Sequence, residues 1–527
     1  MSNANLASER DEQLVLAVDL GTGGPKVGFV SLTGRVAWND HITIETTRLP
    51  DGGAVQDANL WWELIGECTR RGLASGAVAA SRVVAVAITG QYASTVPTDA
   101  QGRPAGDCIM WMDTRGSHHV RPIVGGPVAG YAPTRAATWI RRTGAVPSPA
   151  GGEPLGHMLF VERDLPDVAR ATRWYLEPVD HLTMRFSGRA VATHASQMAS
   201  WLTDNRQLDL LAYDDKLVRL SEVAASKLPP LARTGSVVGE ILPAVADELG
   251  LPRDVRVVTG TPDLHTATYG SGAAMDFEAH MAISTTSWIS APVPFKRTDP
   301  RHAIASMPGC PPGRYVIVNA QDTAGRAYQW VRDVLADGDY RPEYEDLTAL
   351  AARARPGSGN VIFTPWLNGE RSPIDDRTAR GGFHNFSLDT TRADLVRAVL
   401  EGVAFNSKLL LQSVERFAGR RLDDIRLIGG GATSDLWCQT LADIVDRRIE
   451  RVSEPLHAGI RGAALMAGVT LRAVQPEELR GLVTIDAAFT PDPANRDVYD
   501  RLFAEFPKLY KAQKGMFSRL NSRRRTA

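Results

Sequence analysis

The sequence predicts a mixed α/β fold with two sheet-bearing halves, and three observations lead to this prediction. Apolar runs with the pattern of strands buried on both faces occur at residues 14–18, 83–88 and 255–258. Stretches with helical spacing separate and follow these runs. Each half also opens with a strand that enters a turn of small residues. Two such hairpins suggest a duplicated domain that holds phosphate between its copies.

Composition indicates an ordinary globular protein. The chain has 527 residues, 43% of them hydrophobic and 23% charged, with a net charge of −1. No basic excess points to nucleic acid, and no apolar run is long enough for a membrane span. The polar start is unlike a signal peptide, so we expect a cytoplasmic protein. Its four cysteines are far apart, which predicts free thiols in a reducing compartment.

The first hairpin, over residues 14–34, is the strongest candidate for phosphate binding. Asp19 ends the first strand, and Gly21, Thr22, Gly23 and Gly24 follow. Successive N–H groups in such a turn form a concave nest for an anion. Asp19 is placed to hold Mg²⁺ through waters, and Lys26 is placed to reach a terminal phosphate. The alternative is an ordinary turn, since the stretch matches neither of two common nucleotide-binding glycine motifs.

Residues 109–116 form a candidate sugar site. Trp111, Asp113 and Arg115 alternate at a predicted strand end, so we expect them to share one face. An aromatic ring can cover the C–H side of a sugar while charged groups bind its hydroxyls. The alternative is a structural Arg–Asp pair beside a core tryptophan.

Asp263 is the candidate general base. It follows the strand at residues 255–258 and precedes a predicted helix at 265–269. In open α/β sheets this edge faces the ligand crevice. The polarity of the helix start is expected to keep the carboxylate ionised, as a base requires. The alternatives are an N-cap role for Asp263 and, for His265, a packed or surface position.

The second half repeats these features. An apolar strand at residues 280–283 enters the polar turn 284–287, and a long Gly/Pro-rich loop begins at 361. Residues 394–417 have helical spacing, with Thr391 as the candidate N-cap.

A strand at residues 425–428 then leads into three glycines, 429–431, and a helix at 434–446. The glycines leave room for a flat ring or a phosphate, or else mark a tight backbone crossing. The small residues of 459–468 predict a helix that packs closely on a neighbour.

Seven segments together carry a resemblance to a known family. They are DLGTGGPK (19–26), WMDTR (111–115), GTPD (260–263), NGERSP (368–373), RAVLEGVAF (397–405), GGGATSDLWCQTLAD (429–443) and GAALMAG (462–468). In this order and spacing the chain resembles the FGGY family of carbohydrate kinases, nearest its xylulokinase-like branch, from about residue 14 to 468.

The resemblance implies two ribonuclease-H-like domains of the actin-like ATPase type around a central cleft. We expect a disordered tail at 1–13, a sugar-binding domain at 14–272, a nucleotide-binding domain at 276–470, and a helical extension with a basic tail at 471–527. The implied partner is a small sugar or polyol, and a homodimer is left open.

The implied activity is ATP-dependent phosphorylation of a sugar or polyol hydroxyl, with Mg²⁺ and with a ketopentose such as xylulose as the leading substrate. By resemblance, the catalytic base is Asp263. The phosphate and metal residues are Asp19, Gly21, Thr22, Gly23, Lys26, Thr285 and Thr286; the adenosine residues are Gly430, Gly431 and Ser434; the sugar residues are Gln91, Tyr92, Trp111 and Asp113.

Several positions depart from the family pattern. Pro25 removes one N–H from the first turn, Ser284 replaces a glycine in the second, and Leu264 follows the base where an amide is common. Ala93 stands where xylulokinases have a histidine at the sugar, and residues 191–196 lack an Asp often seen there. These departures leave two alternatives: a kinase of glycerol or another polyol, and a catalytically impaired sugar-binding regulator.

Overall fold

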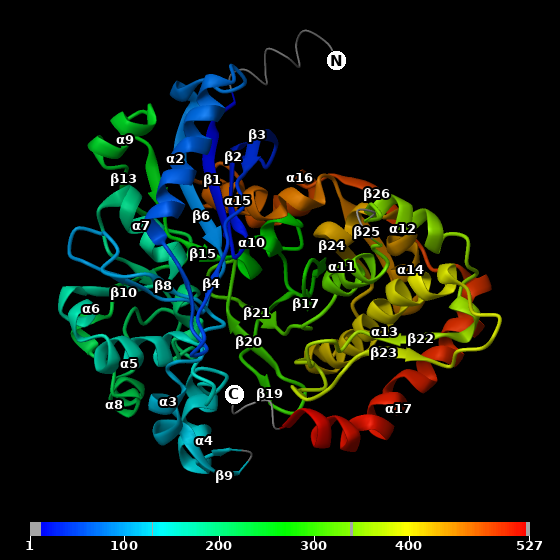
Figure 1. The fold of residues 1–527 in the computed structure, drawn as a ribbon. Helices are drawn as coiled ribbons and strands as arrows, with labels where there is room; N and C mark the ends of the chain where they lie inside the picture. The colour runs from blue at the N-terminus through cyan, green and yellow to red at the C-terminus, as the bar shows by residue number, and fades with distance from the viewer. Residues whose placement is uncertain (1–11, 129, 338–340, 523–527) are drawn as a thin grey trace.

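The computed structural model describes residues 12–128, 130–337 and 341–522. It contains two β-sheets flanked by helices, with helices α10 and α15 between them (Figure 1). The predicted mixed α/β fold with two sheet-bearing halves is confirmed. Residues 1–11 of the expected tail and the basic tip at 523–527 lie outside the described residues. Glu12, within the expected tail, forms an ion pair of 2.6 Å with Arg35.

The first sheet contains the predicted glycine hairpin. Strands β1 (Leu14–Gly21) and β2 (Gly24–Ser31) pair antiparallel, and β3 (Val36–His41) adds to β2. On the other side of β1, strands β6 (Val83–Gly90) and β14 (Arg256–Val258) run parallel to it, and β13 (Val237–Glu240) closes that edge. The short strand β15 (Thr261–Pro262) also pairs with β6.

The first strand is apolar over residues 14–18, as expected for a strand that is covered on both faces. Leu14, Leu16 and Val18 join the core under α2 (Ala58–Ala74) and α7 (Pro178–Ser187). Val15 and Ala17 face the opposite core, with α10 (Asp263–Gly270) and α15 (Ala458–Thr470). Alternate residues of a strand point to opposite faces, so each face receives its own set.

The second sheet repeats the hairpin followed by parallel strands. Its order is β17-β16-β24-β25-β26. The hairpin is β16 (Ala279–Ile283) and β17 (Ser287–Ser290); β24 (Asp424–Ile428) and β25 (Arg448–Val452) run parallel to β16, and β26 (Ile485–Phe489) is antiparallel. The predicted strands of this half are therefore present.

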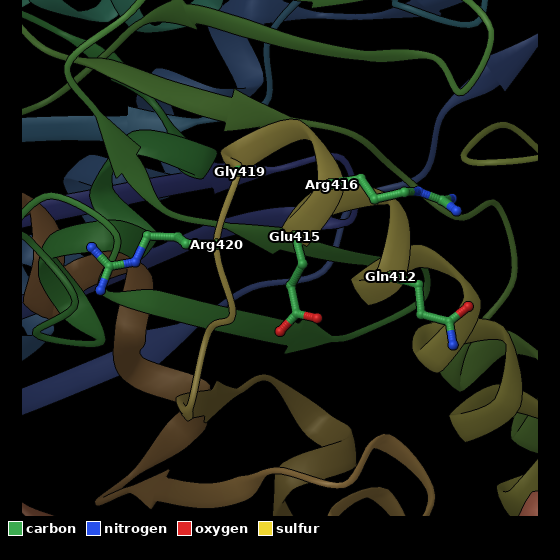
Figure 2. A pocket seen from close by; sticks show the side chains of 5 residues that line it. All are labelled: Gln412, Glu415, Arg416, Gly419 and Arg420. Atoms are coloured by element: carbon green, nitrogen blue, oxygen red, sulfur yellow. The ribbon is translucent and has the colours of Figure 1, made fainter.

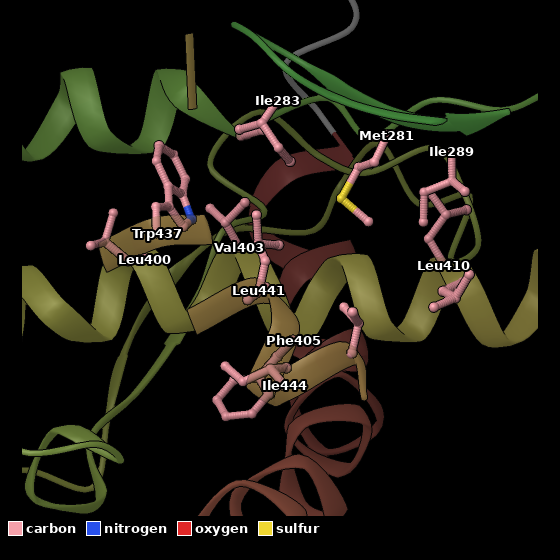
Figure 3. Close-up of a cluster of buried hydrophobic side chains, with 14 of the residues drawn as sticks. Met281, Ile283, Ile289, Leu400, Val403, Phe405, Leu410, Trp437, Leu441 and Ile444 are labelled. Atoms are coloured by element: carbon pink, nitrogen blue, oxygen red, sulfur yellow. The ribbon is translucent and has the colours of Figure 1, made fainter. Parts of the chain in front are cut away.

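The core of the second half lies between this sheet and two helices, α13 (Arg392–Ala418) and α14 (Asp435–Val445). Figure 3 shows Met281 and Ile289 of the hairpin facing Val403 and Leu410 of α13. Thr391 caps α13 as predicted, and the helix begins and ends within two residues of the expected bounds.

The remaining elements surround these two cores (Figure 1). In the first half they are β4 (Thr47–Arg48), β5 (Ala54–Gln56), β7 (Val96–Thr98), β8 (Cys108–Ile109), α3 (Ser117–Val124), β9 (Gly125–Val128), α4 (Pro133–Arg142), α5 (Pro154–Asp164), α6 (Pro166–Ala171), β10 (Trp174–Leu176), β11 (Ala192–Thr193), α8 (Asp215–Ser221), β12 (Leu231–Ala232) and α9 (Pro243–Leu249). In the second half they are β18 (Pro292–Val293), β19 (Thr298–Asp299), β20 (Ile304–Pro308), β21 (Tyr315–Val318), α11 (Gly325–Val334), α12 (Tyr344–Ala351), β22 (Ile362–Thr364), β23 (Gly382–His384), α16 (Leu479–Leu482) and α17 (Arg496–Asn521). The expected loop after residue 361 thus begins and ends in a small hairpin, β22 with β23.

Helix α15 joins the two halves. It belongs to the second half in sequence but packs on β1, β6 and α10 of the first. The contact is close because both helices carry glycines: a Cβ at Gly462 would lie 1.8 Å from the carbonyl oxygen of Thr266. This confirms the close packing predicted from the small residues of 459–468. All four cysteines are buried and free, and every helix of the described chain is too short or too polar to cross a membrane.

Candidate active site

The carboxyl edge of the first sheet brings three predicted site segments together. The strand registers align Leu20 of β1 with Gly90 of β6, and Gly90 with Pro262 of β15. The chain segments that follow, with the glycine turn, Gln91 and Asp263, therefore leave the sheet at one edge. Three distant parts of the sequence meet there, at the position where open α/β sheets bind ligands.

The glycine turn depends on glycine at Gly24. Its φ is +129°, and a Cβ there would lie 2.0 Å from the carbonyl oxygen of Ile42. Gly23, by contrast, faces open space: a Cβ there would have no atom of the described residues within 4 Å. Pro25 continues β2 opposite Leu20, so its missing N–H falls in the sheet ladder. The tip of the turn remains exposed for a ligand.

Thr22 links this turn to the predicted sugar residues. Its hydroxyl donates to Oε1 of Gln91 at 3.1 Å and accepts from the indole N–H of Trp111 at 3.2 Å. Its backbone oxygen accepts from Nε2 of Gln56 at 2.8 Å. The side chain that resemblance assigns to phosphate is thus engaged with Gln91 and Trp111.

Asp263 is the first residue of α10. Pro262 occupies the N-cap position, so the alternative of Asp263 as an N-cap does not hold. Burial, together with the nearby charge of Asp19, raises the pKa of Asp263 to about 7, although Oδ1 accepts a hydrogen bond of 2.7 Å from the N–H of Leu264. The expectation that the helix start keeps this carboxylate ionised is therefore wrong: desolvation and Asp19 outweigh the helix start.

Asp19 lies against the first turn of α15. A Cβ at Gly459 would be 2.1 Å from Oδ2 of Asp19, so only glycine leaves room for the carboxylate. Burial raises the pKa of Asp19, while the charges of Lys26 and His41 oppose that rise. Lys26 pairs with Asp19 across the hairpin, and its Nζ donates to the carbonyl oxygen of Leu456 at 2.6 Å.

The second hairpin contacts the triple-glycine turn. A Cβ at Gly429 would lie 2.6 Å from the carbonyl oxygen of Ile283, and one at Gly431 would lie 2.3 Å from Cγ2 of the same residue. Thr285 is exposed and Thr286 half-buried at the hairpin tip. The structure therefore brings the predicted second phosphate turn and the predicted adenosine turn together.

The short segment Pro455–His457 connects the two glycine turns. Its residue Leu456 receives the hydrogen bond from Lys26 of the first hairpin. The carbonyl oxygen of Pro455 accepts from the N–H of Gly429, and the Leu456 side chain is the nearest group to Gly430. Ser434, in turn, caps α14 by accepting from the N–H of Trp437 at 3.3 Å. These contacts join the predicted nucleotide residues of both halves.

Residues 111–115 differ from the prediction. They form a turn after β8, and their side chains do not share one face: Trp111 is 41% exposed while Asp113 is fully buried. Asp113 accepts from the N–H of Ala54 at 2.9 Å and from Arg115 at 2.8 Å. Its oxygens are thus held by protein donors, as in the alternative of a structural Arg–Asp pair. The prediction of a shared face was wrong because the chain turns at these residues, and alternation places side chains on one face only in an extended strand.

Two further residues near the site, Glu177 and Arg371, are not among the predicted site residues. Glu177 is buried and accepts from the N–H groups of Ala93 and Ser94, each at 3.2 Å, and so holds the loop that carries Gln91. It belongs to none of the seven segments. Arg371 does belong to one, NGERSP, and its Nε lies 2.7 Å from Oδ1 of Asp322.

Tyr92 lies close enough to Asp263 and Arg371 to be affected by the charge of each. Burial and the charge of Asp263 raise its pKa to about 12, and the charge of Arg371 opposes that rise. An arginine of the second half thus acts electrostatically on a predicted sugar residue of the first.

Two other features lie apart from this site. A surface hollow of about 450 Å³ at the end of α13 is lined by Gln412, Glu415, Arg416, Gly419 and Arg420 (Figure 2). None of the predicted site residues lines it.

His118, His119 and Asp164 form the one group of potential metal ligands that the described residues bring together. Nε2 of His119 already bonds to Asp164 at 2.6 Å, and Arg163 approaches Nδ1 at 3.4 Å, so the group is satisfied without an ion.

Comparison with known proteins identifies similar chains over almost the whole length. The N-terminal domain model of the FGGY family of carbohydrate kinases matches residues 14–270, and the C-terminal domain model matches residues 278–471. A xylulose kinase from Staphylococcus epidermidis is 27% identical over 510 residues, covering 95% of this chain and 97% of its own. Other curated relatives, at 22–28% identity, are a gluconokinase, a glycerol kinase and an autoinducer-2 kinase.

Solved structures show the same fold. A ligand-bound xylulose kinase from Lactobacillus acidophilus superimposes with a TM-score of 0.84 at 20% identity, covering 96% of this chain and 99% of the other. A glycerol kinase from Plasmodium falciparum, solved with ADP, gives a TM-score of 0.78 at 19% identity, with coverage of 94% and 98%. At these identities the similarity establishes the two-domain architecture.

Proposed function

Because the chain belongs to the FGGY family of carbohydrate kinases, it is a phosphotransferase that acts on an alcohol group, and we propose that its acceptor is a ketopentose such as xylulose. ATP is the phosphoryl donor in this family. The substrate proposal is supported by the recurrence of xylulose kinases among both the curated relatives and the solved structures that resemble this chain.

The observation that carries the assignment of phosphoryl transfer to this site is the placement of Asp263. It lies at the edge where the first glycine turn ends, and its pKa of about 7 matches the working pH of a cytoplasmic enzyme. A general base is most effective when its pKa is near the operating pH. We assign Asp263 the role of accepting the proton from the sugar hydroxyl as the oxygen attacks the γ-phosphorus.

The rest of the rate enhancement falls to positioning and charge stabilisation. Phosphoryl transfer has a loose transition state, so in-line alignment and donors to the phosphoryl oxygens dominate. We assign the backbone N–H groups of Gly21, Thr22 and Gly23 to the phosphate. Lys26 would have to leave the carbonyl oxygen of Leu456 to reach it.

Asp19 is the residue that fits a magnesium ion. Its carboxylate is half-buried at the end of β1, and burial raises its pKa, as expected for an anion whose countercharge is incomplete. Carboxylate oxygens are the ligands that Mg²⁺ prefers, usually with several waters retained. A bound Mg²⁺ would neutralise charge on the phosphates. Asp19 would hold it directly or through water.

The remaining nucleotide residues come from the second half. We assign the tip of the second hairpin, with Thr285 and Thr286, to the phosphates, and Gly430, Gly431 and Ser434 to the adenosine. The open side of Gly430 faces Leu456, whose side chain is 51% exposed. An exposed leucine beside a glycine offers an apolar surface for a flat base.

The sugar residues are assigned to the platform beside the first glycine turn. Trp111 offers an exposed ring face, and Gln91 a buried amide whose Nε2 has no partner among the described residues. Tyr92 lies near Asp263, and Asp113 supports the platform through Arg115. Ala93 lacks the imidazole expected of a xylulokinase, so the contact to the sugar at this position must differ.

A substrate panel tests the proposal. D-xylulose, D-ribulose, glycerol and D-gluconate would each be supplied with ATP and Mg²⁺, and ADP release followed in a coupled assay. We expect sugar-dependent ADP release that is fastest with a ketopentose. A preference for glycerol would favour the polyol alternative. Tight sugar binding without ADP release would favour a sugar-binding regulator and contradict the proposal.

A further inference from the structure

Three residues form one hydrogen-bonded chain between the glycine turn and the sugar platform. The indole N–H of Trp111 donates to Oγ1 of Thr22 at 3.2 Å, and the Thr22 hydroxyl donates to Oε1 of Gln91 at 3.1 Å. Gln91 is only 5% exposed, and within the described chain its Nε2 finds no hydrogen-bond partner. A buried amide with an unused N–H₂ group is costly unless a ligand completes it.

The hydrogen bond from Thr22 to Gln91 excludes a simultaneous hydrogen bond from Thr22 to a phosphate. A threonine hydroxyl has a single proton to donate. The oxygens of a bound phosphate are acceptors only, as is Oε1 of Gln91. Thr22 therefore cannot donate to a phosphate while it donates to Gln91.

We propose that Thr22 is a switch that couples the two substrates. Before sugar binds, the Thr22 hydroxyl donates its hydrogen bond to Gln91. A sugar hydroxyl that binds Gln91 takes the place of Thr22, whose hydroxyl then donates its hydrogen bond to the phosphate. This inference rests on the proposed kinase function. A sugar has both donors and acceptors, so its hydroxyls can satisfy Oε1 and Nε2 of Gln91 together. Thr22 is then free to turn its proton toward the nucleotide.

The switch makes a directional prediction. A hydrogen bond to a charged phosphate is stronger than one to a neutral amide. Releasing Thr22 therefore tightens nucleotide binding, and linkage requires nucleotide to tighten sugar binding by the same factor. Couplings of this kind are commonly about 5-fold to 150-fold. Without sugar, a nucleotide gains this contact only by breaking the hydrogen bond between Thr22 and Gln91, and the loss of that bond weakens its binding.

The test uses nucleotide binding without turnover. The affinity of the β,γ-methylene analogue of ATP, with Mg²⁺, would be measured by calorimetry for the wild type, Gln91→Met, Thr22→Val and the double variant, all without sugar. Methionine keeps the length of glutamine but removes Oε1. We expect Gln91→Met to bind the analogue about fivefold or more tightly than the wild type. Thr22→Val and the double variant should show no such gain.

Thr22→Ser is the matched control, since it retains the hydroxyl and should keep the wild-type response. In a second measurement, the panel sugar with the fastest turnover should tighten analogue binding to the wild type and to Thr22→Ser, but not to Thr22→Val. A folded Gln91→Met variant without a gain in affinity would overturn the switch, as would a Thr22→Val variant that keeps the sugar effect. If the wild type bound no nucleotide at all, the kinase function itself would fail instead.

Discussion

At the scale of single residues, the two carboxylates at the edge of the first sheet are electrostatically coupled, and the roles proposed for them differ. Asp19 and Asp263 come from distant segments, and the charge of Asp19 raises the pKa of Asp263. Asp19 has the nearby charges of Lys26 and His41 to favour its ionised form. Like charges that are close together separate in pKa, which suits one to a cation and the other to a proton.

Asp263→Asn tests the assignment of the base. The amide keeps the shape of the side chain but cannot accept the hydroxyl proton, so we expect kcat to fall by about 10²- to 10⁴-fold. Affinity for ATP should change little, since no nucleotide contact is assigned to this residue. Steady-state kinetics and nucleotide titration on the same preparation would check both. A variant with wild-type turnover would remove Asp263 from the role.

The pH dependence of kcat/KM should reveal the same group. Below its pKa of about 7 Asp263 is protonated and cannot act as a base, so log kcat/KM for the sugar should rise with unit slope and level off above that pH.

Asp19→Asn tests the coupling of the two carboxylates. It removes one cause of the raised pKa of Asp263, so that pKa, followed by carbon-13 NMR, should fall. An unchanged value would contradict the coupling of the two carboxylates.

Asp263 should also lower the stability of the ligand-free protein at high pH. Its folded pKa, about 7, exceeds the value near 3.9 of an unfolded aspartate, so the folded state binds the proton more tightly. Stability is therefore lost as pH rises through that window. We expect Asp263→Asn to raise Tm by about 2 °C or more at pH 8 and by clearly less at pH 5, which lies only about one pH unit into that window. Calorimetry at both pH values measures this, and an equal effect at each would count against it.

At the scale of elements, the cap of α13 is a clear case of local sequence determining structure. The N–H of Asp394 donates to Oγ1 of Thr391 at 3.2 Å, and the N–H of Thr391 donates to Oδ2 of Asp394 at 2.9 Å. Such a reciprocal pair satisfies two otherwise unpaired donors at a helix start. Thr391→Ala should cost about 1 kcal/mol in the free energy of unfolding.

Thr391→Ser is the control for this cap, because the shorter side chain keeps the hydroxyl. Denaturant unfolding of both variants should show a loss for alanine and near wild-type stability for serine. Equal losses would mean that the methyl group matters, and not the hydrogen bond.

Elements governed by local patterns could be predicted from the sequence, and elements governed by tertiary contacts could not. The run at residues 14–18 predicts a strand covered on both faces, and the two cores on either side of β1 supply that cover. Residues 111–115 show the limit. Their alternation suggested a shared face, but the chain turns there. Asp113 is buried, and its carboxylate accepts hydrogen bonds from Ala54 and Arg115. Periodicity does not reveal a turn that distant partners stabilise.

At the scale of the whole molecule, the candidate site depends on contacts between segments hundreds of residues apart. The motif residues around Asp19, Asp263 and the two hairpins were recognisable because their order and spacing are distinctive. The contacts of Thr22, Glu177 and Arg371 were not, since each partner lies elsewhere in the chain. The raised pKa of Asp263 is of the same kind, because it arises from burial and from Asp19.

The junction between α10 and α15 sets the relative position of the parts of this site. Asp263 begins α10, Gly459 in the first turn of α15 makes room for Asp19, and the two helices cross with backbones in contact. A displacement of α15 therefore acts on both carboxylates and on the segment 455–457 before it, which receives Lys26. The architecture thereby makes the site sensitive to the packing of one helix pair.

Gly462→Ala tests this dependence. A Cβ at residue 462 would lie 1.8 Å from the carbonyl oxygen of Thr266 and 3.0 Å from the nitrogen of Gly270, both backbone atoms of α10. Backbone cannot rotate aside, so the helices must separate, at a cost typical of overpacking, about 1–3 kcal/mol or more. We expect a lower Tm and a larger proportional loss in kcat than in nucleotide affinity, because Asp263 shifts relative to the phosphate.

Gly481→Ala is the matched control for Gly462→Ala. Gly481 lies in the helix α16 with open space around it, so alanine should be neutral or stabilise the protein by up to about 1 kcal/mol. Should both variants behave alike in unfolding and turnover, the close crossing of α10 and α15 would not be what holds the site together.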